Sequence, residues 1–331
     1  MAQRTDWLVG LSDDHIDELE AAAGGLLADG RTLETVGNED VSLPELDQLL
    51  ADVTSDVLTG RGFVLLRGLP VDRWDLETTA AAYWIIGTRL GQPVSQNARG
   101  HLLGHVRDLG NDPDSPKTRI YTTRAAQEFH TDSCDIVGLL CLKPAAKGGA
   151  SSLASSTAIY NEIAEKRPDL AHVLMQHFTV DRKGEVPDGK GPTYDLPIFH
   201  DFAGHITAIY ARSFIRAAQS RPGVTRLTEA QNEAMDMVDA LAASDAFRFD
   251  MDFRPGDMQF LHNHQILHAR TAYEDHADPA QKRHLLRLWL SARPGRQLPP
   301  GFAERYGPLE DGAVRGGIRV AGVKPVVSLT P

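Results

Sequence analysis

The stretch "EFHTDSCDIVGLLCLKP", residues Glu128 to Pro144, decides the fold class because it places polar groups at the mouth of an apolar, β-prone run. Polar side chains at the edge of a barrel or sandwich strand either face water or hold a ligand. If the stretch is extended throughout, His130 and Asp132 project from one face with their backbones about 7 Å apart. They could then converge on one metal ion. They could equally be ordinary structural groups, because His-x-Asp tripeptides are common.

Short, turn-bounded runs follow this stretch and are typical of an antiparallel sandwich or barrel. They occupy residues 150–156, 178–183, 206–215, 247–253, 257–263 and 283–291. A β-type run precedes them at 62–70, and helical patterns occupy 12–28, 43–60, 76–91, 156–174 and 227–244. No repeat or strong linker divides the chain, so we expect one domain over residues 1–331. Its expected parts are a helical N-terminal extension (1–60), a core with helical insertions (61–295) and a C-terminal tail (296–331).

The composition is that of an ordinary globular enzyme, with 42% hydrophobic and 24% charged residues. The net charge of -11 argues against a nucleic-acid surface. The N-terminus lacks the apolar core of a signal peptide, and no run approaches the roughly 18 apolar residues of a membrane span. We therefore expect a cytoplasmic protein with a small-molecule substrate and no membrane partner, and homo-oligomer formation stays open. Cys134 and Cys141 are too far apart in one extended segment to bridge, so we expect free thiols.

A second group of metal-ligating residues lies in "GDMQFLHNHQILHARTAYED", which contains His262, His264 and His268. A histidine from this distant segment would complete, with the earlier imidazole and carboxylate, a set of two histidines and one aspartate. Such a set leaves three coordination positions open and suits non-haem Fe(II). We favour His268, which should follow a strand and its turn. His262 and His264 are expected to pack or to support the ligands from outside.

Two arginines stand four residues apart in "KRHLLRLWLS", and a strand would place Arg283 and Arg287 on one face with Leu285 and Trp289. Buried guanidiniums require anionic partners because an unpaired buried charge costs several kcal/mol. Ion pairs with aspartate or glutamate are one explanation. Beside an iron site, the other explanation is capture of small-molecule carboxylates, which arginine binds through two parallel hydrogen bonds.

Taken together, "FHTD", "KGGASSLASS", "LHARTAYED" and "KRHLLR" resemble the taurine dioxygenase/TfdA family of Fe(II)- and 2-oxoglutarate-dependent oxygenases. The resemblance extends from about Gly62 to Ser291. It implies an α+β fold with a double-stranded β-helix (jelly roll) core and appended helices. It also implies Fe(II), the cosubstrate 2-oxoglutarate and O2. Such an enzyme releases succinate and CO2 while it oxidises, by default hydroxylates, a small substrate. We expect a carboxylate-bearing or amino-acid-like metabolite.

The resemblance implies three iron ligands: His130, Asp132 and His268. Arg283 matches the arginine that holds the distal carboxylate of 2-oxoglutarate. Ser151 falls where the family commonly has a threonine that shares this carboxylate. Two alternatives stay open for the residues that hold 2-oxoglutarate: Ser152 could act in place of Ser151, and Arg287 could act in place of Arg283.

The substrate side is less closely matched to the family. Arg287 corresponds to a position that meets the substrate's anionic group in the taurine enzyme. Asn97 stands where that enzyme has a substrate-contacting histidine, and this departure argues against taurine. Gln96 could also hydrogen-bond the substrate, and Tyr121 is expected to line the approach to iron.

Two other classes of protein remain open from the residues alone. Two histidines and an aspartate could bind Zn²⁺ in a hydrolase, although this leaves Arg283 and Ser151 unexplained. A non-catalytic jelly-roll binding protein could use the same polar residues to hold a ligand. The Gly- and Pro-rich segment 183–197 is expected to be a loop, either a lid over the site or an ordinary surface excursion.

Overall fold

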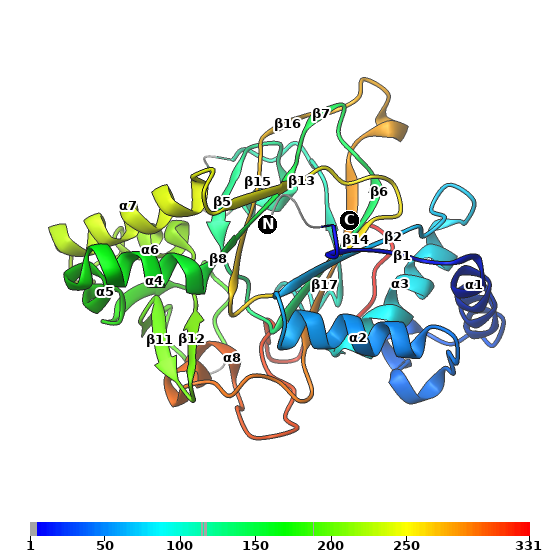
Figure 1. Ribbon diagram of the computed structural model, residues 1–331, viewed down its shortest axis with the longest axis horizontal. Coiled ribbons are helices and arrows are strands. Elements are labelled where there is room, and N and C mark those ends of the chain that lie inside the picture. The colour runs from blue at the N-terminus through cyan, green and yellow to red at the C-terminus, as the bar shows by residue number, and fades with distance from the viewer. Residues whose placement is uncertain (1–4, 114, 116–117, 188) are drawn as a thin grey trace.

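The structure of the protein, a computed structural model, describes residues 5–113, 115, 118–187 and 189–331. It has a mixed fold of helices and strands, as the sequence predicts. Within the described residues, a seven-stranded and a four-stranded sheet form the centre, and helices pack outside them (Figure 1).

The larger sheet is made mainly of leucine-, valine- and phenylalanine-rich strands, whose side chains suit a pleated, buried surface. Its order is β1 (Leu8–Gly10), β2 (Phe63–Arg67), β14 (Met258–His262), β6 (Ile136–Lys143), β17 (His284–Ser291) and β3 (Gln92–Pro93), with β4 (Leu103–Val106) also paired to β17. Side chains alternate along β17, so Leu286 and Leu288 enter the main hydrophobic core. Arg287 and Trp289 point to the opposite face and contact each other.

Three N-terminal helices contribute to this core: α1 (Asp13–Ala28), α2 (Asp47–Leu58) and α3 (Leu76–Leu90). The Ser12 side chain caps α1 by accepting the His15 N–H (3.3 Å). Helix α3 lies directly against the sheet at Gly87, where a Cβ atom would approach Leu288 to 2.5 Å. Any larger residue would therefore displace the Leu288 side chain, and glycine allows the close contact.

The smaller sheet has the order β13 (Arg248–Met251), β8 (Ser151–Ser155), β15 (Ile266–Arg270) and β5 (Gln127–His130), and all its pairs are antiparallel. A second hydrophobic core joins it to a separate helical group, on the left in Figure 1. The group comprises α4 (Ser156–Lys166), α5 (Pro168–Leu174), α6 (Arg212–Ala218) and α7 (Glu229–Ala243).

Three short strand pairs and a C-terminal helix complete the described strands and α-helices. The pairs are β9 (Phe178–Asp181) with β10 (Thr193–Leu196), β11 (Phe199–Phe202) with β12 (His205–Ala208), and β7 (Lys147–Gly148) with β16 (Tyr273–Glu274). Helix α8 spans Ala303–Tyr306. The C-terminal segment is fastened to the interior, because the buried Arg315 donates through Nε to both carboxylate oxygens of Asp135 (3.0 Å each).

The opening stretch of the sequence is not one strand, which corrects the extended conformation expected for it. Strand β5 ends at His130, residues 131–135 form an irregular turn, and β6 begins at Ile136. The two strands belong to different sheets. The alternation rule that was to place His130 and Asp132 on one face therefore does not apply, since Asp132 lies in the turn.

Four other expectations about elements were wrong in part. The expected strand 206–215 ends at Ala208, and α6 begins at Arg212. The helix expected over 156–174 is divided at Arg167, because the ring of Pro168 cannot continue a helix. The segment 183–197 is not a loop throughout, because β10 occupies its last part. The N-terminal extension, expected to be helical, also contributes the strand β1 to the larger sheet.

Cys134 and Cys141 are both free and buried, as expected. Among the described residues, no helix combines the length and the apolar character that crossing a membrane would require.

Candidate active site

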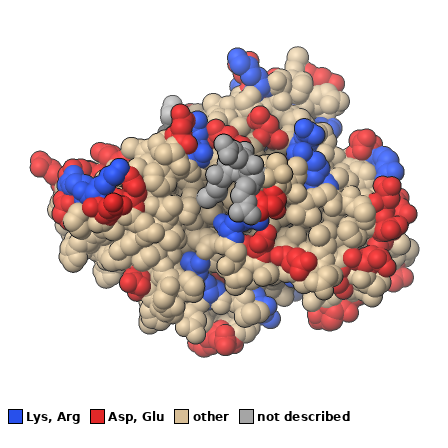
Figure 2. Space-filling model, in the orientation of Figure 1, with Lys and Arg blue, Asp and Glu red and all other residues tan. Residues whose placement is uncertain are grey.

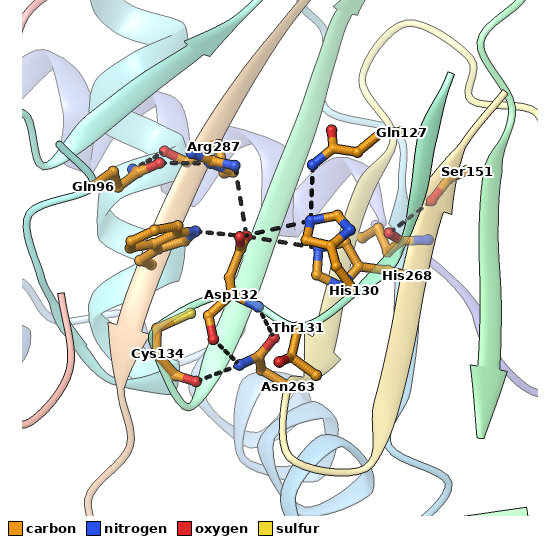
Figure 3. A network of polar contacts seen from close by, with 12 residues as sticks. Gln96, Gln127, His130, Thr131, Asp132, Cys134, Ser151, Asn263, His268 and Arg287 are labelled. Atoms are coloured by element: carbon orange, nitrogen blue, oxygen red, sulfur yellow. Dashed lines mark hydrogen bonds and ion pairs between the residues drawn. The ribbon is translucent and has the colours of Figure 1, made fainter. Parts of the chain in front are cut away.

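Two histidines and one aspartate meet between the two sheets (Figure 3). His130 ends β5 and stands directly opposite His268 of β15, because these antiparallel strands pair at those two residues. The imidazole centroids are 4.2 Å apart. The Asp132 carboxylate lies 3.7 Å from His130 Nε2 and 3.6 Å from His268 Nε2. One potential ligand atom from each residue lies within 4.8 Å of the other two, so the three can converge on a single ion.

The turn that carries Asp132 is held by Asn263, which the sequence did not single out. Asn263 Oδ1 accepts the backbone N–H of Asp132 (2.7 Å). Its Nδ2 donates to the carbonyls of Asp132 (2.7 Å) and Cys134 (2.8 Å). The amide is completely buried, so no water replaces these bonds. It therefore fixes the backbone from which the carboxylate projects.

The Asp132 carboxylate is also oriented directly. The Trp289 indole donates to its Oδ2 (2.9 Å), and Arg287 Nη1 lies 3.5 Å from the same atom. Burial by itself would raise the pKa of the Asp132 carboxyl, but the Arg287 guanidinium and the two imidazoles lower it below its usual range. The group is therefore an ionised ligand.

The orientation of His130 suits metal ligation through Nε2. Its Nδ1 lies 2.9 Å from the Glu128 carbonyl, so Nδ1 must carry the proton and donate it. Nε2 then keeps its lone pair on the side of Asp132, where Gln127 Nε2 also lies 2.8 Å away. Burial, reinforced by His268, lowers the pKa of His130 to about 4. The imidazole is therefore neutral at physiological pH, as a ligand must be.

Arg283 fits an anion that the protein does not itself supply. The residue is 4% exposed, and its Nη1 has no hydrogen-bond partner in the described part of the chain. Its guanidinium lies 5.0 Å from the centroid of the Tyr273 ring, and burial lowers its pKa. Arg283 precedes β17, and a register shift at the strand's start separates it from the regular alternation. It lines a small pocket together with His130 and His268.

Because side chains alternate along β8, the two candidate serines point to opposite faces of the strand. Ser151 lines the small pocket and donates to Gln259 Oε1 (3.1 Å). Ser152 donates instead to Asp250 on the neighbouring strand (2.6 Å) and does not line that pocket. The geometry therefore favours Ser151 over Ser152 as the hydroxyl near Arg283.

Arg287 also lines the small pocket, and Gln96 and two aromatic rings hold it in place. Its Nε donates to Gln96 Oε1 (2.7 Å), and Gln96 Nε2 donates to the Arg287 carbonyl (2.7 Å). The guanidinium lies 4.7 Å from the Tyr121 ring centroid and 4.9 Å from that of Trp289. Asn97 is not brought to this group: its Oδ1 accepts the Arg99 N–H (2.9 Å) in a turn, and it does not line the described cavities.

A cavity of about 600 Å³ opens beside the metal-ligating set. His130, Asp132, Gln96, Tyr121 and Arg287 line its inner part. Its wall is basic, with six lysine or arginine residues against two acidic ones, in a chain whose net charge is -11. On the outer face in Figure 2, acidic side chains gather over the region of α1 and α2, at the right. The cavity therefore differs in charge from the protein's surface and suits an anionic ligand.

His262 and His264 lie outside the metal-ligating set and are completely buried. His264 Nε2 is 2.7 Å from the Asp135 carboxylate, which also binds Arg315. This network lies beneath the turn that carries Asp132. It was not predicted, because its members are scattered in the sequence.

The comparison that decides the family is a match of residues 29–289 to the model described as "Taurine catabolism dioxygenase TauD, TfdA family". The chain belongs to this family. The match begins upstream of Gly62, so α2 and part of the N-terminal extension belong to it as well. The expected class is confirmed: the protein is an Fe(II)- and 2-oxoglutarate-dependent dioxygenase, and the donor set described above fits ferrous iron. The family supports this class over a zinc hydrolase or a non-catalytic binding protein.

Curated relatives and solved structures agree with the family. The chain is 30% identical over 308 residues to FR-33289 synthase of Streptomyces rubellomurinus, with 92% of this chain and 91% of the relative covered. It is 32% identical over 317 residues to taurine hydroxylase-like protein SAT17 of Stachybotrys chartarum, with 90% and 79% covered. An asparagine oxygenase complex with Fe(II), 3-hydroxyasparagine and succinate has a similar fold, with a TM-score of 0.66, 18% identity, and 86% and 93% covered. The non-heme iron oxygenase OrfP with Fe and alpha-ketoglutaric acid has a TM-score of 0.63, 14% identity, and 86% and 94% covered.

Asn263 gives a test of how the turn positions its ligand. For Asn263→Asp, which keeps the acceptor oxygen and loses the two donated bonds, we expect the affinity for Fe(II) to fall about 10- to 100-fold, as for other groups that support metal ligands. Anaerobic titration with Fe(II) measures this, and circular dichroism checks that the protein stays folded. Asn161→Asp, an exposed change on α4, is the matched control. Equal iron affinities of a folded Asn263→Asp variant and the wild type would contradict the role.

Proposed function

We propose that this dioxygenase hydroxylates a small anionic metabolite that bears a carboxylate or resembles an amino acid. The observation that carries the proposal is Arg287, a cation on the wall of the large cavity beside Asp132. Two related structures support it by analogy, since one contains 3-hydroxyasparagine and another a hydroxylated arginine. Two further relatives, 25% and 26% identical to this chain, are named uridine-5'-phosphate dioxygenase, and the compound in that name is an anion.

We assign the metal ligands to His130, Asp132 and His268. When bound, Fe(II) and 2-oxoglutarate supply the oxidising chemistry, which consumes O2 and yields succinate and CO2. Asp132 contributes the negative charge that partly balances the metal. Asn263 and Trp289 hold it in place through the bonds already described.

We assign the distal carboxylate of 2-oxoglutarate to Arg283 and Ser151. Arg283 Nη1 has no hydrogen-bond partner among the described residues, which supports this role, because an unsatisfied buried donor costs free energy. The Ser151 hydroxyl lines the same small pocket. In this proposal Arg287 serves the substrate, and the alternative, in which Arg287 takes the role of Arg283, is tested by the variants below.

On the substrate side, Gln96 keeps the Arg287 guanidinium in one orientation, and Tyr121 covers its face. Both side chains line the cavity, and each can also contact the substrate. Lys183, Tyr194 and Leu196 of the segment 183–197 line it as well, which supports a lid role for that segment. Asn97 has no such support.

The two sheets support the finer prediction of a double-stranded β-helix, with the ligands between them and helices appended outside. The single-domain organisation is part of the same proposal, with residues 61–295 as the core. Cytoplasmic location stays a prediction, and the buried free cysteines are compatible with it. Assembly into a homo-oligomer stays open.

Substrate-dependent release of succinate tests the proposed substrate class. Among amino-acid-like compounds, we expect those with a free carboxylate to stimulate release at least about tenfold better in kcat/KM than their neutral amides, because a hydrogen bond to a charged group contributes about 1.5–3 kcal/mol. In Arg287→Gln this preference should disappear. If amides and carboxylates are used equally by the wild type, the anionic substrate class is wrong.

A further inference from the structure

The large cavity contains a second cationic group that the roles proposed above do not use. Its outer wall includes the turn after β9 and the beginning of α6. There the Phe214 ring contacts two cations, with Lys183 Nζ 4.5 Å and the Arg119 guanidinium carbon 5.2 Å from its centroid. All three residues line the cavity.

This group is separate from Arg287. Arg119 immediately precedes the short 3-10 helix Ile120–Thr122, to which Tyr121 belongs. Tyr121 covers the Arg287 guanidinium, whereas Arg119 contacts Phe214. One short segment therefore contributes to two cationic positions in the same cavity.

Among the residues that the structure describes, no carboxylate pairs directly with Lys183. Arg119 pairs with Glu185, and the neighbouring Arg216 pairs with Glu128 (2.6 Å). The Lys183 ammonium forms no hydrogen bond or ion pair with the rest of the described chain, and it contacts the Phe214 ring. Burial, reinforced by Arg119, lowers the pKa of Lys183, as expected for a cation in unfavourable surroundings.

Lys183 has an unfavourable backbone conformation. Its φ is +48°, in the left-handed region that residues other than glycine rarely adopt. Asp181 stabilises the turn by accepting the Lys183 N–H (2.5 Å) and by pairing with Arg221. A strained and well-supported residue on a cavity wall points to a function for its side chain.

We propose that Lys183, assisted by Arg119, forms a second anion subsite in the substrate cavity. Its ligand is an oxyanion, a carboxylate or a phosphate, at one end of an elongated substrate whose other anionic group meets Arg287. This inference rests on the proposed function, because it assigns the same cavity to the substrate. It predicts that the physiological substrate carries two anionic groups.

Binding of inorganic phosphate and of acetate to the anaerobic holoenzyme, loaded with Fe(II) and 2-oxoglutarate, tests the subsite by calorimetric or NMR titration. Lys183→Gln, which keeps a polar side chain one atom shorter and removes the charge, should weaken binding at least about tenfold. Lys183→Arg should restore it to within a few-fold. Lys190→Gln is the matched control, because Lys190 lies in the same loop, pairs with Glu304 (2.8 Å) and does not line the cavity.

The two probes distinguish the two kinds of oxyanion. Lysine-dependent binding of phosphate alone supports a phosphate-bearing substrate, and comparable binding of acetate supports a second carboxylate. The subsite is overturned if neither probe binds the wild type, or if Lys183→Gln binds both as the wild type does. Succinate release by the wild type is measured separately. If phosphate binding depends on Lys183 but no anionic compound stimulates succinate release, the subsite stands and the proposed function fails.

Discussion

Asp132→Ala should lose more than about 100-fold in substrate-dependent succinate release, because even groups that only support metal ligands contribute 10- to 100-fold. The substitution removes the anionic ligand and leaves the two imidazoles without the charge between them. We expect the same for His130→Ala and His268→Ala. Steady-state kinetics with excess Fe(II) measures the loss, and anaerobic titration shows whether iron binding has failed.

The control for this series is a change that removes the same chemical group away from the cavity. Asp245→Ala and His205→Ala are suitable, since both side chains lie at exposed positions. Each should keep wild-type turnover. Full activity in any one of the three ligand variants would show that the residue concerned does not hold the iron.

Arg283→Ala should weaken 2-oxoglutarate binding by about 30-fold or more, because losing one partner of a buried charge pair costs about 2–5 kcal/mol. The apparent KM for 2-oxoglutarate should rise accordingly, while Fe(II) affinity changes little. Arg283→Lys should recover only part of the loss, because lysine cannot form two parallel bonds to one carboxylate. Titration of the anaerobic Fe(II) protein with 2-oxoglutarate measures the affinity directly.

Arg99→Ala is the matched control, since Arg99 is exposed and lies outside both pockets. A normal 2-oxoglutarate affinity in Arg283→Ala, together with a loss in Arg287→Ala, would exchange the roles of the two arginines. That result would also remove Arg287 from the substrate side.

Many helices and strands could be predicted from the sequence because the patterns that specify them are local. Helix α1 carries its capping serine and acidic first turn in consecutive residues. Strands β6 and β17 are long apolar runs, and the alternation of β17 separates its core leucines from Arg287 and Trp289. These patterns depend on neighbours a few residues apart, and a sequence displays them directly.

The break between His130 and Ile136 was missed because it contains no proline or glycine. The cluster Thr-Asp-Ser-Cys-Asp at 131–135 was the available signal, since these residue types favour turns. The turn is stabilised by Asn263, which is 131 residues from Asp132 in the chain. Strand β15 was also missed: it has five residues and is held by pairing with β8 on one side and β5 on the other. Tertiary pairing of this kind leaves no periodic signal.

The residue types of the candidate site were predicted better than its geometry. His130, Asp132 and His268 converge, but through a strand end, a turn and a second strand instead of one extended segment. Gln96 lies beside Arg287, whereas the side chain of its neighbour Asn97 accepts the backbone N–H of Arg99. A resemblance between short motifs does not tell which of two adjacent amides faces a cavity.

The position of iron in a crystal of the anaerobic protein, located by anomalous scattering at the iron edge, tests the central claim most directly. We predict one iron per chain, within bonding distance of His130 Nε2, the Asp132 carboxylate and His268 Nε2. Iron beside His262 or His264, or iron bound without one of the three predicted ligands, would contradict the assignment.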